Sequence, residues 1–320
     1  MRRLFGGALL TLMSAGIATP VHAAGDGAGW TFTDDLGVTV TLDEPPTRVA
    51  ALSDVAYSLM NYGVEPVAIF GYSGITNDVR FDDLDTSGIA EVGAVYGEIN
   101  LEALAAADPD LIVTNQYPVD QAGTIDESAP RYGFADTAQQ AAVAEIAPIV
   151  TIAMRGTARD VIDRTTELSV ALGASDGIVA TAREDFATAS ADLASAGERG
   201  IEVVVLYAEP ANVYVAKAPD DPSLRMYADL GVDLADPGGD DYYWSVLSWE
   251  QFPSIAADVV LYSERGLLPD DLAENAVFAA TPAAAAGQVH PWVFAGMDYA
   301  SSAAYMNELA GFLDTAEDVS

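Results

Sequence analysis

Tyrosines, tryptophans and arginines follow several expected strands of this chain. Ligands of parallel sheets bind at the carboxyl ends of the strands, where such side chains meet. Arginine with aromatic rings suits a bulky, partly apolar anion, because guanidinium pairs with chelate oxygens and the rings stack on its faces. Alternatively, the tyrosines pack at element ends and the arginines pair with nearby acids. The candidate ligand-binding residues are Tyr72, Arg80, Tyr96, Tyr117, Arg155, Tyr207, Tyr243, Trp244 and Trp292.

The sequence lacks the motifs that would make these residues part of an enzyme. Gly71-Tyr72-Ser73-Gly74 has the wrong spacing for a nucleophile elbow, and no phosphate loop surrounds the lone Lys217. A Ser-His-Asp triad would have to use His290, whose neighbours Pro291 and Trp292 are more typical of a packed residue. We therefore expect no catalytic residue. A secreted α/β hydrolase that uses His290 stays open as an alternative.

No metal-binding residues are expected. The chain has no cysteine and only two histidines, His22 and His290, which excludes thiolate and multi-histidine sites. The densest acidic cluster, residues 236–241, lacks the alternating ligands and closing Glu of an EF-hand. A calcium site there is the weaker alternative, and we expect no cofactor.

The chain is long and strongly acidic. Its 320 residues exceed the usual size of one hydrophobic core, so we expect two lobes. Lys and Arg number 13 against 49 Asp and Glu, a formal charge of −36. Because such a charge repels nucleic acid and anionic membranes, neither is an expected partner. Scattered acids are typical of a solvated surface in salty surroundings.

The first residues have the pattern of a secretory signal peptide. Arg2-Arg3 precedes an apolar run over residues 4–17, and Val21-His22-Ala23 is a small-residue cleavage pattern. We predict cleavage after Ala23, which removes residues 1–23 and leaves a periplasmic protein. Without a cysteine there, no lipid anchor is expected. An uncleaved anchor and a twin-arginine signal are the alternatives.

Short β-branched runs alternate with alanine-rich segments, the pattern of parallel sheets with crossover helices. The expected strands are residues 48–52, 66–70, 110–114, 148–153, 201–207 and 258–262, preceded by a hairpin of residues 30–32 and 38–42. Helices are expected to begin at caps Ser53 and Asn100, and a helix over residues 157–172 to end at Gly173. Ser248 and Gln251 have the spacing of a capping box.

Residues 176–196 stand apart because they contain no proline and are rich in strong helix formers. At 1.5 Å per residue they would form a helix of roughly 30 Å. This segment lies near the middle of the mature chain, between two strand-helix halves. We therefore expect a lobe over residues 24–174, a linker helix over 175–198 and a second lobe over 199–320. A surface crossover helix within one larger domain is the alternative.

Two distant segments have similar patterns. Residues 100–113 align without gaps with residues 248–261, and each reads as cap, bulky residue, Glu, short helix, Asp and buried strand. Glu102 and Glu250 therefore share one position, the second residue of each expected helix. A Glu there interacts favourably with the positive end of the helix. Alternatively, each lobe presents one exposed carboxylate to arginines of a docking partner.

These segments resemble the iron-siderophore/cobalamin class of periplasmic binding proteins, which serve ABC importers. The resemblance covers about residues 30–313 and rests on residues 48–53, 62–67, 92–93, 100–104, 108–112, 249–250 and 257–260. It implies an α/β fold of two Rossmann-like lobes joined by a single long rigid helix, the class III periplasmic binding protein fold, with the ligand between the lobes. It also implies that a Glu on each lobe docks onto permease arginines, and Glu102 and Glu250 fall on those positions.

We therefore expect an extracytoplasmic substrate-binding protein that captures a ferric siderophore and delivers it to a membrane permease. The iron is expected to arrive already chelated, and the protein to be a monomer. Binding of haem or cobalamin, and an adhesin or sensor of the same fold, are the alternatives. The absent lipobox suggests a periplasm between two membranes. The class of siderophore stays open.

Overall fold

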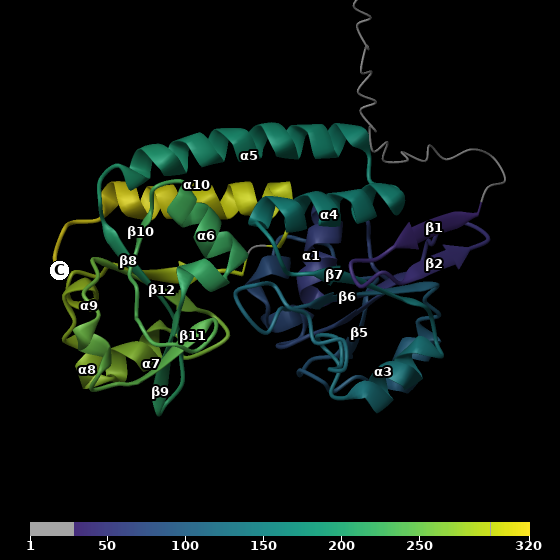
Figure 1. The fold of residues 1–320 in the computed structure, drawn as a ribbon, viewed down its shortest axis with the longest axis horizontal. Coiled ribbons are helices and arrows are strands. Elements are labelled where there is room, and N and C mark those ends of the chain that lie inside the picture. The colour runs from purple at the N-terminus through teal and green to yellow at the C-terminus, as the bar shows by residue number, and fades with distance from the viewer. Residues whose placement is uncertain (1–28, 295) are drawn as a thin grey trace, which may run out of the picture.

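The computed structural model describes residues 29–294 and 296–320, which contain two large β-sheets flanked by helices and a separate two-stranded hairpin (Figure 1). In the first sheet the strand order is β5-β4-β3-β6-β7, and all neighbouring strands are parallel. This confirms the four strands expected in the first half and adds β5. The strands are β3 (Val49–Leu52), β4 (Ala68–Phe70), β5 (Ala90–Gly93), β6 (Leu111–Gln116) and β7 (Ile149–Ala153).

The expected amino-terminal hairpin is present beside this sheet. β1 (Trp30–Thr33) pairs antiparallel with β2 (Thr39–Leu42). Asp34 in its turn accepts a hydrogen bond from the Thr151 backbone of β7 at 3.1 Å. Arg164 lies over the Phe32 ring at 4.3 Å and pairs with Asp35 at 2.7 Å. These contacts attach the hairpin to the edge of the first sheet.

The second sheet is mixed rather than wholly parallel. Its order is β11-β9-β8-β12-β13, with β10 paired to the beginning of β8. β9 pairs antiparallel with both β8 and β11. The three residues between β8 and β9 are too few for a crossover connection, so these two strands form a hairpin. The strands are β8 (Glu202–Ala208), β9 (Asn212–Ala216), β10 (Asp233–Leu234), β11 (Trp244–Ser248), β12 (Val259–Ser263) and β13 (Val289–Trp292).

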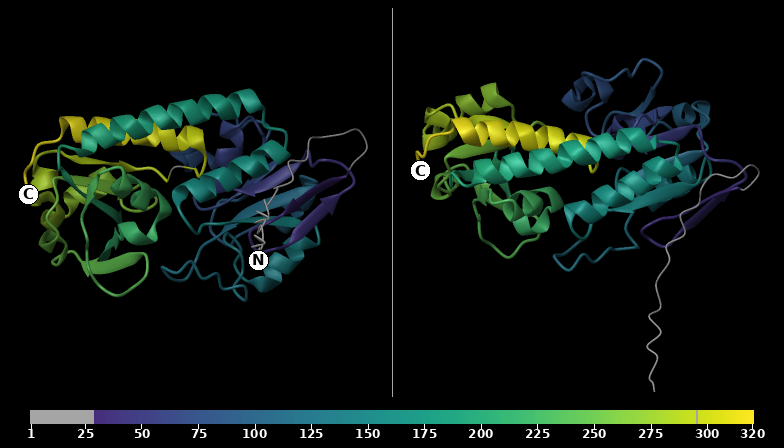
Figure 2. Two further views of the ribbon diagram at one scale, coloured as in Figure 1. Left: turned by 45° about the horizontal axis from the view of Figure 1, so that its top comes forward. Right: turned by 90° about the horizontal axis from the view of Figure 1, so that it is seen from above.

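One continuous helix joins the two sheets, as expected from the sequence. α5 (Asp176–Gly197) has 22 residues and begins at Ser175, whose hydroxyl accepts from the Ile178 backbone. It follows α4 (Ala158–Ala171) of the first half and leads directly to β8. The helix does not cross alone. α10 (Tyr299–Thr315) runs beside it over much of its length, as Figures 1 and 2 show.

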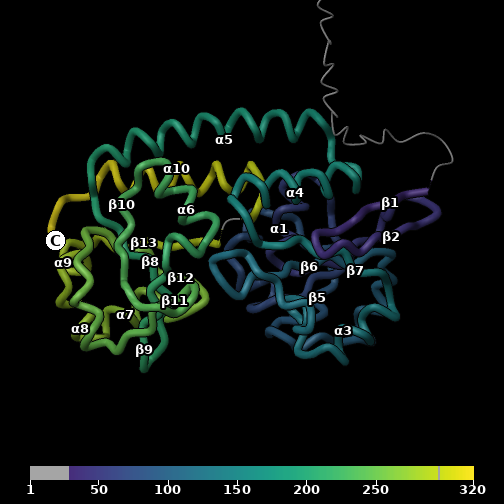
Figure 3. The backbone as a smooth tube through the Cα atoms, in the orientation of Figure 1, coloured from purple at the N-terminus to yellow at the C-terminus, as the bar shows by residue number. Residues whose placement is uncertain are grey.

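The chain returns to the first half before α10 begins (Figure 3). Tyr62, buried at the end of α1 (Ser53–Asn61), accepts a hydrogen bond through its hydroxyl from the Tyr299 backbone at 2.9 Å. The same hydroxyl lies 2.9 Å from that of Thr166 on α4. A tyrosine of the first half therefore anchors the start of the helix that runs back to the second.

A cation-aromatic cluster holds α4, α5 and α10 together. The Arg159 guanidinium lies 4.9 Å from the Phe186 ring and 5.1 Å from the Tyr299 ring. Arg183 covers Tyr299 at 5.1 Å, and the Tyr299 hydroxyl donates to Asp163. Because three helices share these contacts, the connection between the sheets resists bending about α5.

Two expected helix starts are wrong. Ser53 is the first helical residue of α1 and makes no capping hydrogen bond, because Leu52 occupies the N-cap position. No α-helix follows Ser248. The Ser248 N–H does donate to the Gln251 side chain at 3.0 Å, but only a 3-10 turn, η4 (Phe252–Ser254), follows. Pro253 explains the difference, since it lacks the N–H that an α-helix would need there.

The other expected helix signals are confirmed. Asn100 caps α2 (Leu101–Ala106) by accepting from the Ala103 backbone at 3.0 Å, and Gly173 adopts the left-handed conformation after α4. The remaining α-helices of the described residues are α3 (Thr137–Ala144), α6 (Pro222–Asp229), α7 (Pro269–Glu274), α8 (Ala276–Ala279) and α9 (Pro282–Ala285). Among these residues no helix has both the length and the apolar character needed to span a membrane. The expected signal peptide, residues 1–23, lies outside the described residues.

Candidate ligand-binding cleft

Two adjoining cavities lie between the halves of the molecule. The first is lined from one side by Asp54, Asn115 and Tyr117, and from the other by Asp221 and Trp292. The second is lined by residues that include Asp120, Arg155, Asp220, Arg225 and Tyr242. Met154 and Pro222 line both cavities, which therefore form one cleft. Its walls follow the carboxyl ends of β3, β6 and β7, where a parallel sheet positions ligand groups.

Four tyrosines form a cluster on the first half, and three of them were expected there. Ring centroids lie 5.3 Å apart for Tyr72 and Tyr96, and 4.5 Å apart for Tyr117 and Tyr132. Tyr132 also lies 5.7 Å from Tyr72 and 5.3 Å from Tyr96, so it joins the set. Tyr72, Tyr96 and Tyr117 follow β4, β5 and β6 respectively, which explains why the strand ends bring them together.

A second aromatic cluster lies on the other half. Trp244 is at its centre, with ring centroids 4.9 Å from Tyr243, 6.2 Å from Trp292 and 6.3 Å from Tyr207. All four were expected to bind ligand. Trp292 also lines the first cavity, opposite Tyr117. Aromatic surface therefore lies on both sides of the cleft.

Tyr243 is held in an unusual backbone conformation. Its φ of 68° lies in the left-handed region, which residues with a side chain rarely adopt. Two neighbouring acids compensate: the Tyr243 N–H donates to Asp220 at 3.0 Å, and its hydroxyl donates to Asp221 at 2.8 Å. Burial, followed by the charge of Asp221, raises the pKa of Tyr243, so the hydroxyl stays a donor. Strain maintained by such contacts is typical of functional sites.

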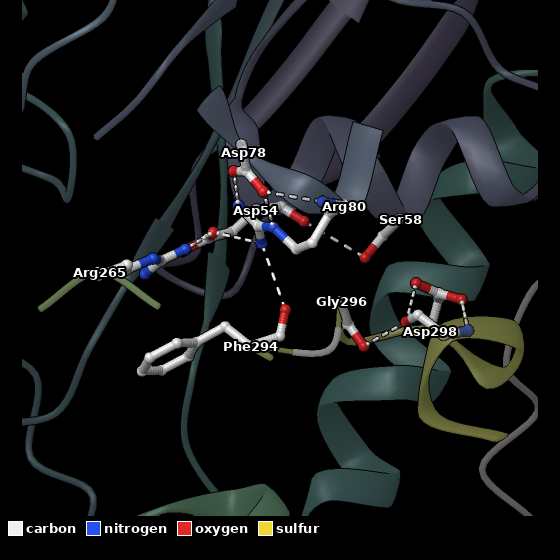
Figure 4. Close-up of polar contacts among 9 residues, drawn as sticks. Asp54, Ser58, Asp78, Arg80, Arg265, Phe294, Gly296 and Asp298 are labelled. Carbon is white, nitrogen blue, oxygen red and sulfur yellow. Dashed lines mark hydrogen bonds and ion pairs between the residues drawn. The ribbon is translucent and has the colours of Figure 1, made fainter. Parts of the chain in front are cut away.

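Asp54, in the first turn of α1, is the centre of an ion-pair network at the edge of the cleft (Figure 4). Its carboxylate lies 2.8 Å from Arg80 and 2.5 Å from Arg265. Arg80 also pairs with Asp78 at 2.5 Å and donates to the Phe294 carbonyl at 3.3 Å. Burial alone would raise the pKa of Asp54, but the two arginines outweigh it and lower the pKa to about 2.

Arg265 of the second half contacts residues of the first half, and it was not among the ligand-binding residues expected from the sequence. It follows β12 on the second half, whereas Asp54 and Tyr72 belong to the first. Its guanidinium lies 4.7 Å from the Tyr72 ring and 4.4 Å from the Phe294 ring. The signal was available, because Arg265 lies three residues beyond Tyr262 and thus just past the expected strand of residues 258–262. Asp54, which follows the strand of residues 48–52, was missed in the same way.

The two expected arginines have different surroundings. Arg80 is 8% exposed, and its guanidinium is engaged by Asp54 and Asp78, so it is a structural residue at the edge of the cleft. Arg155 lines the second cavity and donates to the Asp35 carbonyl at 3.3 Å. Across from it, Arg225 of α6 donates to the Gly156 carbonyl. Arg155 and Arg225 therefore form opposite walls of the second cavity.

The lone lysine also has a structural role near the cleft. Lys217 is 7% exposed, and its ammonium group donates to the carbonyls of Gly239, at 2.7 Å, and Asp241. Gly239 has a φ of 85°, a conformation that glycine adopts without strain. These bonds fix the glycine-rich loop that precedes Tyr243. Within residues 29–294 and 296–320, no group of three or more His, Cys, Asp or Glu side chains is placed to hold a metal ion.

His290 is packed rather than poised for catalysis. Its ring stacks on Phe312 with centroids 4.1 Å apart and planes 7° apart. Burial lowers its pKa, which favours the neutral ring. His290 lies on β13, but it is not among the residues that line either cavity.

The two candidate docking residues are both exposed but lie in different local structures. Glu102 is in the first turn of α2, as expected. Glu250 lies in a turn between β11 and η4 instead of a helix, for the reason given for Pro253. Hydrogen bonds from its own backbone and from the Ser248 hydroxyl lower the pKa of Glu250.

Comparisons with solved structures support the observed arrangement. The chain is 28% identical to DesE, a ferric-siderophore receptor protein from Streptomyces coelicolor, with a TM-score of 0.80 over 91% of this chain and 100% of that one. It is 22% identical to the siderophore periplasmic binding protein of the fuscachelin gene cluster of Thermobifida fusca (TM-score 0.61, covering 84% and 96%). It is 20% identical to the siderophore-binding protein FhuD from Vibrio cholerae, solved with Fe3+-Desferal (TM-score 0.59, covering 84% and 99%). No curated protein matches the chain.

A protein-family comparison agrees with the structure. The model of the periplasmic binding protein family matches residues 49–292, which include both sheets and the helix between them. Family membership places the protein outside the cytoplasm and identifies it as a substrate-binding protein rather than an enzyme. From the two-lobed fold, the cleft and this match, we conclude that the chain belongs to the periplasmic binding protein family.

Proposed function

We propose that this protein captures a ferric siderophore in the cleft and delivers it to the permease of an ABC importer. The observation that carries the proposal is the pair of aromatic clusters, around Tyr132 and Trp244, on the two sides of the cleft. Rings on both sides suit a bulky ligand with apolar faces and a polar metal centre. The likeness to DesE, whose ligand is a ferric siderophore, supports the same class of ligand here.

The proposed ligand arrives with its iron already chelated. Tyrosine hydroxyls could in principle bind ferric iron directly, but burial, the largest effect on each, raises the pKa of Tyr117 and Tyr132. Protonated phenols donate hydrogen bonds to chelate oxygens and are poor ligands for the metal itself. The protein therefore supplies surface and hydrogen bonds, and no resident cofactor is needed for this function.

Fluorescence quenching tests the proposal. Trp292 lines the first cavity and Trp244 packs against it, so a bound ferric chelate should quench a large part of the emission. The mature protein would be titrated with ferric hydroxamate, catecholate and citrate chelates, and with haem and cobalamin. Saturable quenching by a ferric siderophore supports the proposal. Saturation by haem or cobalamin alone, or by none of these compounds, contradicts it.

A matched pair of variants locates the quenching. Trp244→Phe should remove much of the signal change, because its ring packs against Trp292, which lines the first cavity. Trp249→Phe should leave it intact, because Trp249 packs against Phe252 and Phe278 in a separate core. Equal loss in the two variants would indicate that the chelate does not bind beside Trp244.

We further propose that Glu102 and Glu250 dock onto the permease. Each is an exposed carboxylate, one on each half of the molecule. The combined Glu102→Arg and Glu250→Arg variant should lose transport in cells while ligand affinity in solution stays unchanged. Lower affinity of the variant would show that these carboxylates act at the binding site instead.

The remaining features of the organisation are proposals of the same kind. We infer a lobe over residues 24–174, a linker helix over 175–198 and a lobe over 199–320, supported by the position of α5 between the two sheets. We infer a periplasmic monomer, released by cleavage after Ala23 and not lipidated. Mass spectrometry of the protein secreted by its host tests the cleavage site and the lipidation, and sedimentation tests the oligomeric state.

A further inference from the structure

The charges of the cleft nearly cancel, although the sequence led us to expect positive charge for an anion. The charged residues that line the two cavities, together with the partners of Asp54 and Arg80, consist of five aspartates and four arginines. They are Asp54, Asp78, Asp120, Asp220, Asp221, Arg80, Arg155, Arg225 and Arg265. The cleft therefore provides no surplus of positive charge for a polyanion.

The two arginines that pair with Asp54 are already neutralised within the protein. Arg80 is paired with two carboxylates and is 3% exposed in its side chain. Arg265 is paired with Asp54 at 2.5 Å and lies against two aromatic rings. An anionic ligand would have to displace Asp54 from Arg265 and would leave that carboxylate buried without its partner.

The second cavity presents acids as well as arginines. Asp220 is 6% exposed and lines this cavity, and its Oδ1 has no hydrogen-bond partner among the described residues. Its other oxygen accepts from the Tyr243 backbone at 3.0 Å, which fixes the orientation of the carboxylate. Asp221, also 6% exposed, lines the first cavity. A buried carboxylate oxygen without a partner favours a ligand that donates a hydrogen bond or carries positive charge.

We propose that the cleft selects ferric chelates without net negative charge, uncharged or cationic and with N–H donors that can reach Asp220, and discriminates against polyanionic tris-catecholates. The inference rests on the proposed function and narrows it to a class of substrate. The formal charge of −36 acts in the same direction, because it raises the cost of bringing an anion to the cleft from solution.

A charge series with constant iron coordination tests the proposal. Ferric desferrioxamine B carries one positive charge on its pendant amine, the N-acetylated chelate is uncharged, and the N-succinylated chelate carries one negative charge. Affinities of the mature protein for the three would be measured by tryptophan quenching, with a ferric tris-catecholate as the polyanionic member. We expect the succinylated chelate to bind about tenfold more weakly than the cationic one, and the tris-catecholate about a hundredfold more weakly.

Isosteric variants assign the preference to the cleft. Asp220→Asn removes the charge while keeping an oxygen for the Tyr243 N–H, and it should reduce the ratio of cationic to anionic affinity by about threefold or more. Asp229→Asn is the matched control, because Asp229 is exposed at the end of α6 and lines neither cavity. Circular dichroism would confirm that both variants are folded.

The outcomes separate this inference from the proposed function. Tighter binding of the succinylated chelate or the tris-catecholate would overturn the charge preference while confirming a siderophore-binding protein. Equal ratios in Asp220→Asn and wild type would overturn the role of Asp220. If no chelate of any charge binds, both the proposed function and this inference are wrong.

Discussion

Replacing Asp54 by asparagine tests the ion-pair network that connects the two halves of the molecule. The side chain of Asp54 is 11% exposed, and that of Arg80 is 3% exposed, so solvent screens their attraction little. The pKa of Asp54 falls from 3.8 to about 2, which at about 1.4 kcal/mol per pKa unit corresponds to about 2 kcal/mol of folding free energy. The variant also leaves Arg265 without its carboxylate partner. We therefore expect Asp54→Asn to lower the free energy of unfolding by about 2 to 5 kcal/mol.

The same shift sets the pH dependence of the effect. Because the pKa of the folded state lies below the ordinary value, the contribution is complete above about pH 4 and is lost as the pH falls toward 2. Urea unfolding of wild type and Asp54→Asn at pH 6 and pH 3 measures the difference. The gap at pH 3 should be about 1 kcal/mol smaller than that at pH 6.

Asp82→Asn is the control for this experiment, since Asp82 is exposed and close to Arg80 in the sequence. It should change stability by less than about 0.5 kcal/mol. An Asp54→Asn protein as stable as wild type at pH 6, or a gap that is the same at both pH values, would refute the network as described.

Four further substitutions probe the scaffold by urea unfolding. Tyr62→Phe should cost about 1 to 3 kcal/mol, because it leaves the buried Tyr299 N–H without its acceptor; no loss would contradict the anchoring of α10. Lys217→Met should lower the free energy of unfolding by a similar amount, because the carbonyls of Gly239 and Asp241 lose their hydrogen-bond donor. It should also weaken chelate binding, because these bonds fix the loop before Tyr243. Unchanged affinity would show that this loop does not contribute to the binding site. Gly266→Ala should destabilise, since the added Cβ would lie 2.6 Å from a backbone oxygen, whereas Gly311→Ala in α10 has free space and should be neutral or stabilising.

The sequence predicted the scaffold well because its signals are local. Proline-free, alanine-rich composition marks α5, and β-branched runs mark β6, β7, β8 and β12. Several strands escaped prediction. β13 contains a histidine and a proline, and β9 and β11 are antiparallel strands whose partners make them stable. Pairing of this kind depends on tertiary contacts rather than on local preference.

The candidate site was predicted in part for a related reason. The sequence predicted that Tyr72, Tyr96 and Tyr117 lie together, because each follows a strand and parallel strands have their carboxyl ends at the same edge of the sheet. The sequence could not show that the guanidinium of Arg80 is paired with Asp54 and Asp78. Such pairing depends on the conformation of loops, which local composition does not encode. Sequence distance concealed the contact between Asp54 and Arg265, which lie 211 residues apart in the chain.

The position of the iron tests the central claim most directly. Crystals of the mature protein grown with a ferric siderophore would be measured at the iron absorption edge, and an anomalous difference map would locate the metal without assumptions about the chelator. We expect one peak in the cleft, between the cluster of Tyr117 and Tyr132 and the cluster of Trp244 and Trp292. A peak on the outer surface, or an ordered chelate bound to one half only, would contradict capture between the two lobes.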